Sequence, residues 1–315
     1  MIRRTKRLIV FITLIVVAYV AYLAISLIFL PPVSVLKDRK KSISITVRDW
    51  QGNKRPFLVG PKNPWWTPSS QMPDEMKWAV ILAEDPNFYH HEGVDVVAIK
   101  RAIRYDLEKR RLARGASTIT QQVAKNVFLS REKTLSRKLK EIYLAWRMED
   151  ELSKGRIVEL YLNVVELGPM VYGIGHGSHY YFGKSPSELT PRECSFLAAM
   201  LPGPRMAFNP YKHLGKVLKR SDDILSWMRQ RGVLTEEEYQ QALAEVPNIN
   251  RLQQKVDTTI VQQEKVFANM SGATVSGEAT ESDGTKDSVL LPKGGEALPP
   301  PLGSGENAPV AEPVK

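Results

Sequence analysis

Apolar and polar residues alternate with a helical period through most of the chain, from Asp74 to about Asn250. In the segment 135–152 the apolar positions fall on one predicted helix face, formed by Leu135, Leu139, Ile142, Trp146 and Met148. The same period predicts helices at Glu75–Ala83, Val94–Arg111, Thr118–Val127, Leu135–Leu152, Arg156–Val165, Thr190–Met200, Leu214–Gln230 and Glu236–Glu245. The pattern contains no alternation of strands with helices and no glycine-rich nucleotide loop, so we expect an all-α domain.

The N-terminal region contains one long apolar run, Leu8–Leu30, which carries no charge. As a helix it would be about 35 Å long, enough to cross a hydrocarbon core of about 30 Å. A cleaved signal peptide is the alternative, but the run is long for one and no A-x-A-like cleavage site follows it. We therefore expect a retained anchor that ends at Pro31-Pro32, because proline breaks helices. Four basic residues precede the run and predict a cytoplasmic N-terminus, namely Arg3, Arg4, Lys6 and Arg7.

The other segments differ in composition. Residues 42–48 (SISITVR) alternate in polarity and predict a short strand. Trp65 and Trp66 lie in a proline-rich connector, where they either reach the lipid interface or pack on the domain. The C-terminal segment is rich in Gly, Ser, Pro and Glu and is predicted to be disordered. We expect a basic cytoplasmic tail at 1–7, the anchor at 8–30, a membrane-proximal linker at 31–64, a globular domain at 65–250 and the disordered tail at 251–315.

The chain has 315 residues and a formal net charge of +10, which indicates an anionic partner. Nucleic acid, an anionic membrane and a phosphorylated substrate all fit that charge. A domain outside the cell would meet no DNA or RNA, so we exclude nucleic acid and keep the other two. The single cysteine, Cys194, lies in an apolar stretch and is predicted to be a small buried hydrophobe.

The first candidate site residue is Glu84, which follows the apolar run Trp78–Ala83 and precedes a turn at Asp85-Pro86. A carboxyl group at the mouth of a cleft, partly desolvated and beside a second carboxylate, has a raised pKa. Such a pKa suits a general base. The alternative is a solvated helix end, since most acidic pairs lie on the surface.

The second candidate carboxylate is Glu141, which shares a helical stripe with Arg137 and lies three residues from Lys138. The alternative is an ordinary exposed ion pair, which is worth only a few tenths of a kcal/mol.

A dense polar run occupies Gly115–Asn126, and a Thr118–Gln121 capping box can open its helix. The start of that helix favours an anion, and Lys125 can act as a point charge on a phosphate group. A well-capped amphipathic helix explains the capping pair but not the whole polar row. Basic residues flank the run in two clusters: Lys100, Arg101, Arg104, Lys109, Arg110, Arg111 and Arg114, then Arg131, Lys133, Arg137, Lys138 and Lys140. Such clusters are usually solvated faces, but beside an anchor they also hold anionic headgroups.

Five motifs in this order resemble the family-51 glycosyltransferases, the peptidoglycan polymerases that use lipid II. They are Glu84–Gly93 (EDPNFYHHEG), Gly115–Asn126 (GASTITQQVAKN), Arg137–Glu149 (RKLKEIYLAWRME), Ile157–Gly168 (IVELYLNVVELG) and Gly173–Pro202. The resemblance covers about residues 65–215 and is far more specific than any single motif. It implies a lysozyme-like helical domain of two lobes, a larger lobe and a smaller membrane-proximal lobe, with the substrate cleft between them.

The resemblance also assigns residue roles. Glu84 matches the catalytic base, which would deprotonate the GlcNAc 4-hydroxyl of lipid II. Glu141 matches a second essential carboxylate, which positions the sugar pyrophosphate or its metal. The implied substrate-binding residues are Asp85, Phe88, His91, Ser117, Thr118, Gln121, Gln122, Lys125, Asn126, Lys133, Arg137 and Lys138. Among these, Arg137, Lys138 and Lys133 are candidates to stabilise the departing undecaprenyl pyrophosphate.

A divalent cation, Mg²⁺ or Mn²⁺, is the implied cofactor, bound through the substrate pyrophosphate and not by protein ligands. His176 and His179 are spaced three residues apart, but two histidines alone do not make a metal site. The chain departs from the family at Gly177-Ser178, where an Ala-Ala pair is common. This difference predicts looser helix packing there.

The resemblance implies growth of a glycan on lipid II with inversion, a β-1,4 bond and release of undecaprenyl pyrophosphate. Bifunctional relatives add a penicillin-binding transpeptidase domain, and we expect a monofunctional enzyme, since the two S-x-x-K matches are isolated and no K-T-G occurs. We expect a single-pass protein of the bacterial inner membrane with an external domain, whose partners are lipid II, nascent glycan, membrane lipids and other cell-wall or divisome proteins. A lysozyme-like glycan-cleaving enzyme and a non-catalytic scaffold remain as alternatives.

Overall fold

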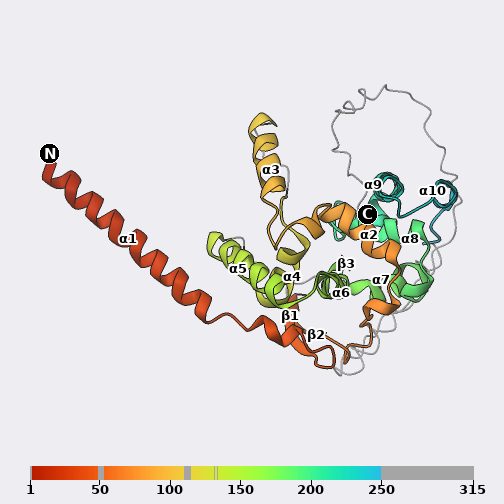
Figure 1. The fold of residues 1–315 in the computed structure, drawn as a ribbon, viewed down its shortest axis with the longest axis horizontal. Helices are drawn as coiled ribbons and strands as arrows, with labels where there is room; N and C mark the ends of the chain where they lie inside the picture. Colours follow the sequence, from red (N-terminus) through yellow and green to blue (C-terminus); the bar gives the residue numbers. More distant parts are fainter. Residues whose placement is uncertain (1, 49–52, 110–114, 131, 133, 250–315) are drawn as a thin grey trace, which may run out of the picture. The chain divides into compact units, whose positions relative to one another are not determined.

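The computed structural model describes residues 2–48, 53–109, 115–130, 132 and 134–249 and is mainly helical, as the apolar period predicts (Figure 1). The predicted disordered tail at 251–315 lies outside the described residues. So do five of the predicted basic residues, Arg110, Arg111, Arg114, Arg131 and Lys133.

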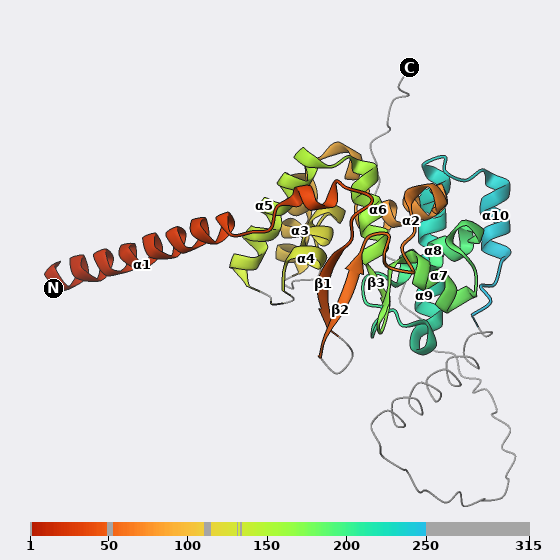
Figure 2. The ribbon, with the colours of Figure 1, turned by 90° about the horizontal axis from the view of Figure 1, so that it is seen from below.

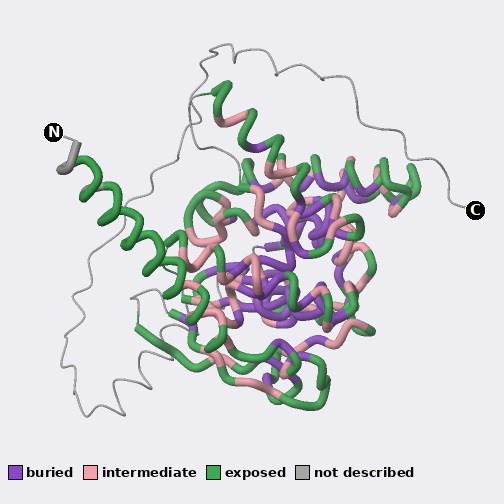
Figure 3. Tube along the Cα trace, turned by 60° about the vertical axis from the view of Figure 1, so that its left-hand side comes forward, coloured by how far each residue is buried: buried purple, intermediate pink, exposed green. Residues whose placement is uncertain are grey.

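The predicted anchor forms helix α1 (Ile2–Ile28), which ends just before Pro31-Pro32. A 3-10 helix, η1 (Val33–Leu36), follows it and is partly buried. Within the described part of the chain, α1 is the one helix long and apolar enough to cross a membrane. Its residues are exposed along most of its length, whereas buried residues gather in the centre of the domain (Figure 3).

The predicted strand is confirmed as β1 (Ile43–Arg48), and it pairs with an unpredicted strand, β2 (Lys54–Val59). The two strands form an antiparallel hairpin in which Ile43 faces Val59 (Figure 2). Pro56 sits within β2, opposite Thr46, and a proline inside a short run hides the strand pattern.

The connector after the hairpin packs on the domain, which decides between the two positions expected for its tryptophans. The Trp65 ring stacks on His176 with 5.0 Å between the ring centroids. The Arg156 guanidinium lies 5.6 Å from the centre of the Trp66 ring. Thr67, which follows Trp66, is held by the Asn163 side chain, because the Asn163 amide exchanges two 2.8 Å hydrogen bonds with the Thr67 backbone.

All eight predicted helices are present, with ends that differ by a few residues. The helices of the domain are α2 (Asp74–Glu84), α3 (Val96–Lys109), α4 (Ile119–Phe128), α5 (Leu135–Glu151), α6 (Lys154–Val164), α7 (Gly173–Phe182), α8 (Pro191–Met200), α9 (Pro210–Gln230) and α10 (Glu236–Ala244). Two short strands, β3 (Glu166–Gly168) and β4 (Val171–Tyr172), connect α6 to α7. Helix α6 is buried along most of its length, with α4 and α5 on one side and α7 to α10 on the other (Figures 1 and 2). Cys194 is fully buried in α8, as predicted.

The predicted apolar face of α5 is present, but most of its members are not buried. Met148 is buried, but Leu135 is 67% and Trp146 is 52% exposed. The face that α5 buries instead contains Glu141 and Leu144. Helix α3 behaves similarly, because the described structure buries Ala102 and leaves its larger apolar residues exposed, namely Val96, Val97, Ile103 and Leu107.

Two of the three glycines of α7, Gly175 and Gly177, show how the helix is packed near the departure from Ala-Ala. A Cβ atom at Gly177 would meet the end of the Leu167 side chain, which can move to another rotamer. A Cβ atom at Gly175 would collide with the backbone carbonyl oxygen of Trp65, which is held in the connector. Ser178 is fully buried, and its hydroxyl donates to the Gly175 carbonyl oxygen at 3.1 Å. The packing around Gly177-Ser178 is therefore tight, contrary to the looser packing predicted from the sequence.

We predict that Gly175→Ala destabilises the protein by about 2 kcal/mol or more, because an overpacked backbone contact cannot relax. Gly177→Ala should cost less, since only a side-chain end must move. Thermal unfolding of the full chain in detergent measures the stability of both variants. Gly155→Ala on α6 is the control, because nothing lies near its added Cβ and alanine favours helix. Equal losses at Gly175 and Gly177 would contradict this reasoning.

Candidate functional site

Glu84 is the last residue of α2, and three other helices surround its carboxylate. Gln122 of α4 donates to its Oε2 at 2.9 Å. Arg220 of α9 places Nη2 3.9 Å from its Oε1 and donates to the Ala83 carbonyl oxygen at 3.2 Å. Tyr161 of α6 donates its hydroxyl to Gln122 at 3.4 Å. The side chain is 15% exposed, so Glu84 is not a solvated helix end.

The surroundings of Glu84 raise its pKa above the ordinary value of a glutamate, and burial is the main cause. The Gln122 hydrogen bond and the charges of Arg220 and Lys125 lower the pKa in part. Asp85 raises it, but its contribution is the smallest of these. The predicted rise of the Glu84 pKa is confirmed. The neighbouring Asp85 carboxylate contributes less to it than burial does.

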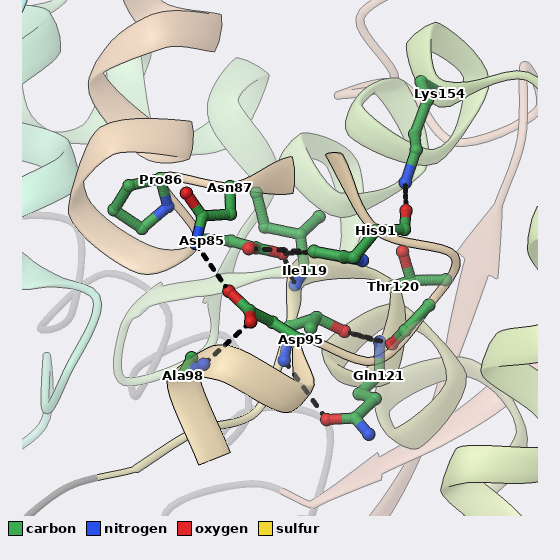
Figure 4. Close-up of polar contacts among 12 residues, drawn as sticks. Asp85, Pro86, Asn87, His91, Asp95, Ala98, Ile119, Thr120, Gln121 and Lys154 are labelled. Carbon is green, nitrogen blue, oxygen red and sulfur yellow. Dashed lines mark hydrogen bonds and ion pairs between the residues drawn. The ribbon is translucent and has the colours of Figure 1, made fainter. Parts of the chain in front are cut away.

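The Asp85 carboxylate forms the link between α2 and α4. His91 Nε2 lies 3.0 Å from both carboxylate oxygens, and the Ile119 N–H donates to Oδ2 at 2.9 Å (Figure 4). Asp85 therefore supplies the anion at the start of α4, a place where the sequence analysis expected a substrate phosphate.

Several of the predicted substrate-binding residues are buried in this link. Phe88 is fully buried, and His91 and Asp85 bind each other. Thr118 caps α4 with Gln121 in the predicted capping box, and its hydroxyl donates to the Gly93 carbonyl oxygen at 2.6 Å. Asp85, Phe88, Thr118 and Gln121 are buried and His91 is half-buried, and direct substrate contact by these five residues stays a prediction. They hold the Glu84 turn against α4, and Lys154 adds to this by donating to the His91 carbonyl oxygen at 2.6 Å (Figure 4).

Glu141 is 2% exposed, so it does not form the ordinary surface ion pair that the sequence left open. Arg137 binds its Oε2, and Lys138 Nζ lies 2.5 Å from its Oε1. Lys138 Nζ also donates to Ser117 at 2.8 Å and to Gln121 at 3.3 Å. A buried carboxylate needs such partners, and here it fixes two cations next to the start of α4.

A cavity of about 560 Å³ brings many of the predicted residues together. Its walls come from the β1 strand, α4, α5, the β3–β4 segment and the loop after α8. Its polar lining consists of Thr46, Ser117, Gln122, Lys125, Asn126, Arg137, Lys138, Glu141, Glu166 and Tyr172. Glu84 does not line this cavity, but its carboxylate is hydrogen-bonded to Gln122, which is a lining residue. A second cavity of about 550 Å³ shares Ile45, Thr46, Asn126 and Leu129 with the first.

The residues of this site do not fit a metal held by the protein. Both lining carboxylates are bound by cations, Glu141 by Arg137 and Lys138 and Glu166 by Arg205. No group of three His, Cys, Asp or Glu residues that could hold a metal occurs in the described part of the chain. We derive no chemical step through a metal ion.

Sequence reasoning missed four residues that shape the site. Arg220 and Tyr161 surround Glu84, while Glu166 and Arg205 form an ion pair at the cavity. Arg220 lies within an ordinary basic helix, so no local signal marks it. Glu166 lies within the fourth motif, which could have drawn attention to it. Lys133, a predicted pyrophosphate contact, lies outside the described residues.

We predict that Asp85→Ala lowers the free energy of unfolding by about 2–4 kcal/mol, because it leaves the Ile119 N–H and the His91 ring buried without their acceptor. Chemical denaturation of the full chain in detergent gives this difference. Asp74→Ala, at an exposed carboxylate paired with Lys77, is the control and should change stability little. If both variants unfold alike, Asp85 does not link α2 to α4.

Comparison with known proteins shows the family of this chain. The family described as Transglycosylase matches residues 56–229, from within β2 to the last turn of α9. Penicillin-binding protein 1A of Escherichia coli (strain K12) is 40% identical over 221 residues, which are 70% of this chain and 26% of that protein. Penicillin-binding protein 1A of Aquifex aeolicus (strain VF5) is 40% identical over 185 residues, 59% of this chain and 25% of that protein.

A crystal structure of penicillin-binding protein 1A from Haemophilus influenzae aligns with 35% of this chain and 18% of that chain, at 32% identity and a TM-score of 0.29. The chain spans about a quarter of the length of the two relatives named above. Because the family match extends over more than half of its residues, this chain belongs to the Transglycosylase family, the family of peptidoglycan glycosyltransferases that its motifs indicated.

Proposed function

We propose that this protein polymerises peptidoglycan glycan strands and uses lipid II as its acceptor. One observation carries the proposal: the Glu84 carboxyl, whose pKa burial raises, is hydrogen-bonded to Gln122 in the wall of a cavity that also presents Lys125, Arg137 and Lys138. A base bonded to the cavity wall and a set of cations in the cavity lining suit attack by a hydroxyl on a sugar whose leaving group is a diphosphate.

In this proposal Glu84 accepts the proton of the GlcNAc 4-hydroxyl of lipid II. The freed oxygen attacks C1 of the MurNAc at the end of the growing strand, and the bond from C1 to the pyrophosphate oxygen breaks. The new bond is β-1,4 with inversion, and the electron pair leaves with undecaprenyl pyrophosphate. A raised pKa makes Glu84 a stronger proton acceptor than an exposed glutamate.

The cations of the cavity have the complementary task, which is to stabilise negative charge as the pyrophosphate leaves. Arg137 and Lys138 are held by the buried Glu141, so they need little reorganisation when the charge develops. Glu141 thus acts in this proposal by positioning the two cations. A divalent cation, Mg²⁺ or Mn²⁺, enters the proposal only as a counter-ion of the substrate pyrophosphate.

We also propose that α1 anchors the domain outside the cytoplasmic membrane of a bacterium as a single span. The basic N-terminus supports this orientation. The exposed apolar residues of α3 and α5 support contact with lipid, since soluble surfaces rarely present such faces beside basic residues. Helix α5 contacts α1 and so lies beside the proposed anchor.

Two other functions remain candidates for the test. A lysozyme-like hydrolase would also use Glu84, but it would have no use for three cations around a diphosphate. A scaffold would need neither the raised pKa of Glu84 nor the buried Glu141 pair.

We predict that Glu84→Gln lowers the rate of glycan polymerisation about 10²–10⁴-fold, because the amide cannot accept the proton. The assay supplies labelled lipid II to the purified full chain in detergent and measures the length of the glycan ladders. Glu92→Gln, at an exposed carboxylate of the same turn, is the control and should polymerise normally. A folded wild-type protein that makes no polymer but digests sacculi would indicate the hydrolase, and one that does neither would indicate the scaffold.

We predict that Arg220→Gln moves the acidic limb of the pH–rate profile to higher pH. The Arg220 charge favours the ionised form of Glu84, so its loss raises the Glu84 pKa further. The base must be ionised, and activity is lost as pH falls through that pKa, which is now higher. The pH dependence of kcat/KM measures the limb. Arg231→Gln, at an exposed arginine that donates to the Pro86 carbonyl oxygen, should leave the limb in place. If the acidic limb of Arg220→Gln stays where it is in the wild type, the Arg220 charge does not lower the pKa of Glu84.

A further inference from the structure

A second ion pair closes one side of the cavity, remote from Glu84 and Glu141 in sequence. Glu166, at the start of β3, lines the cavity with a side chain that is 16% exposed. Arg205, in the loop between α8 and α9, places Nε 2.5 Å from the Glu166 Oε1. Pro204 of the same loop lines the cavity as well.

Arg205 also reaches the hairpin whose strand β1 lines the cavity. Its Nη2 donates to the Arg48 carbonyl oxygen, at the end of β1, at 3.2 Å. The Tyr172 hydroxyl donates to the same oxygen at 3.4 Å, and Tyr172 lies opposite Glu166 in the β3–β4 pair. One guanidinium therefore joins three segments that meet at the cavity.

The ion pair changes the net charge of the cavity lining. Lys125, Arg137 and Lys138 contribute three positive charges, and Glu141 and Glu166 contribute two negative ones, so the lining sums to +1. Adding Arg205 raises the sum to +2. Without the Arg205 charge, the Glu166 carboxylate would be less compensated and would repel an anionic diphosphate in a partly buried cavity, where charges interact strongly.

We propose that Arg205 is a positioning residue, which neutralises Glu166 and holds it against the hairpin so that the cavity accepts a diphosphate. This inference rests on the proposed function, because the diphosphate is that of the proposed substrate. Arg205 acts through Glu166 and takes no part in bond making. Its removal is expected to weaken binding of the anion and to leave the step at Glu84 largely unchanged.

The test compares Arg205→Ala, Glu166→Gln, their double variant and Arg205→Lys, all in the full chain in detergent. Arg205→Ala should raise KM for lipid II about tenfold with little change in kcat, and should weaken binding of inorganic pyrophosphate about tenfold in calorimetry. The double variant should recover both values to within about threefold, because the Glu166 charge is then removed together with the Arg205 charge. Arg205→Lys should stay close to wild type.

Arg229→Ala is the matched control, since it breaks an exposed Arg–Glu pair, with Glu236, at 2.7 Å outside the cavity. Thermal unfolding separates loss of fold from loss of affinity. If Arg205→Ala binds pyrophosphate as wild type does, or if the double variant is as weak as Arg205→Ala, the proposal is overturned. A wild-type protein that makes no polymer would reject the proposed function alone, because pyrophosphate binding still reports on Arg205 and Glu166.

Discussion

The buried Asp85 carboxylate is the contact on which the rest of the site depends. A buried charge is tolerated only when it is hydrogen-bonded, and Asp85 finds its donors in the first N–H of α4 and in the His91 ring. These bonds fix the turn after α2 against α4. The neighbouring residue, Glu84, then points toward Gln122, Tyr161 and Arg220. The α4 N-terminus, which could have bound a phosphate, instead positions the catalytic candidate.

The carboxylates of the cavity are likewise compensated by partners. Glu141 and Glu166 are acidic residues in a cavity proposed to receive an anion, which is unfavourable unless each is compensated. Each carboxylate is bound by arginine or lysine, so each serves to fix a cation in place. Glu141 holds its cations along one helix, whereas Glu166 takes its cation from a loop 39 residues away. Rigid cations stabilise a developing charge better than mobile ones, because their orientation is already set.

The exposed apolar faces of α3 and α5 add a constraint from outside the domain. Both helices are amphipathic, but each presents large apolar residues to its surroundings, among them Leu107 and Trp146. A lipid surface beside α1 would cover those faces without any protein partner. The substrate of the proposed reaction is itself carried by lipid, so such a surface would bring the cavity and the substrate to the same boundary.

The sequence by itself determined the features that depend on near neighbours. The helices follow from an apolar period, α1 from an uncharged run, and the Thr118–Gln121 cap from two residues one turn apart. Helix formation and capping are decided within a few residues of the chain, so these predictions hold to within a turn. The motifs also identified the family, and they named most of the polar residues that line the cavity.

Only the tertiary structure decided which partner each charged group found. Glu84 and Asp85 are adjacent and chemically alike, yet one faces Arg220 and the other meets Ile119, which lies 34 residues away. The apolar face of α5 was misjudged because its period shows that the helix has a face but not what covers it. Glu166 and Arg205 carry no local signal of their pairing. Burial and charge compensation arise from contacts between distant segments, and a local pattern contains no information about those contacts.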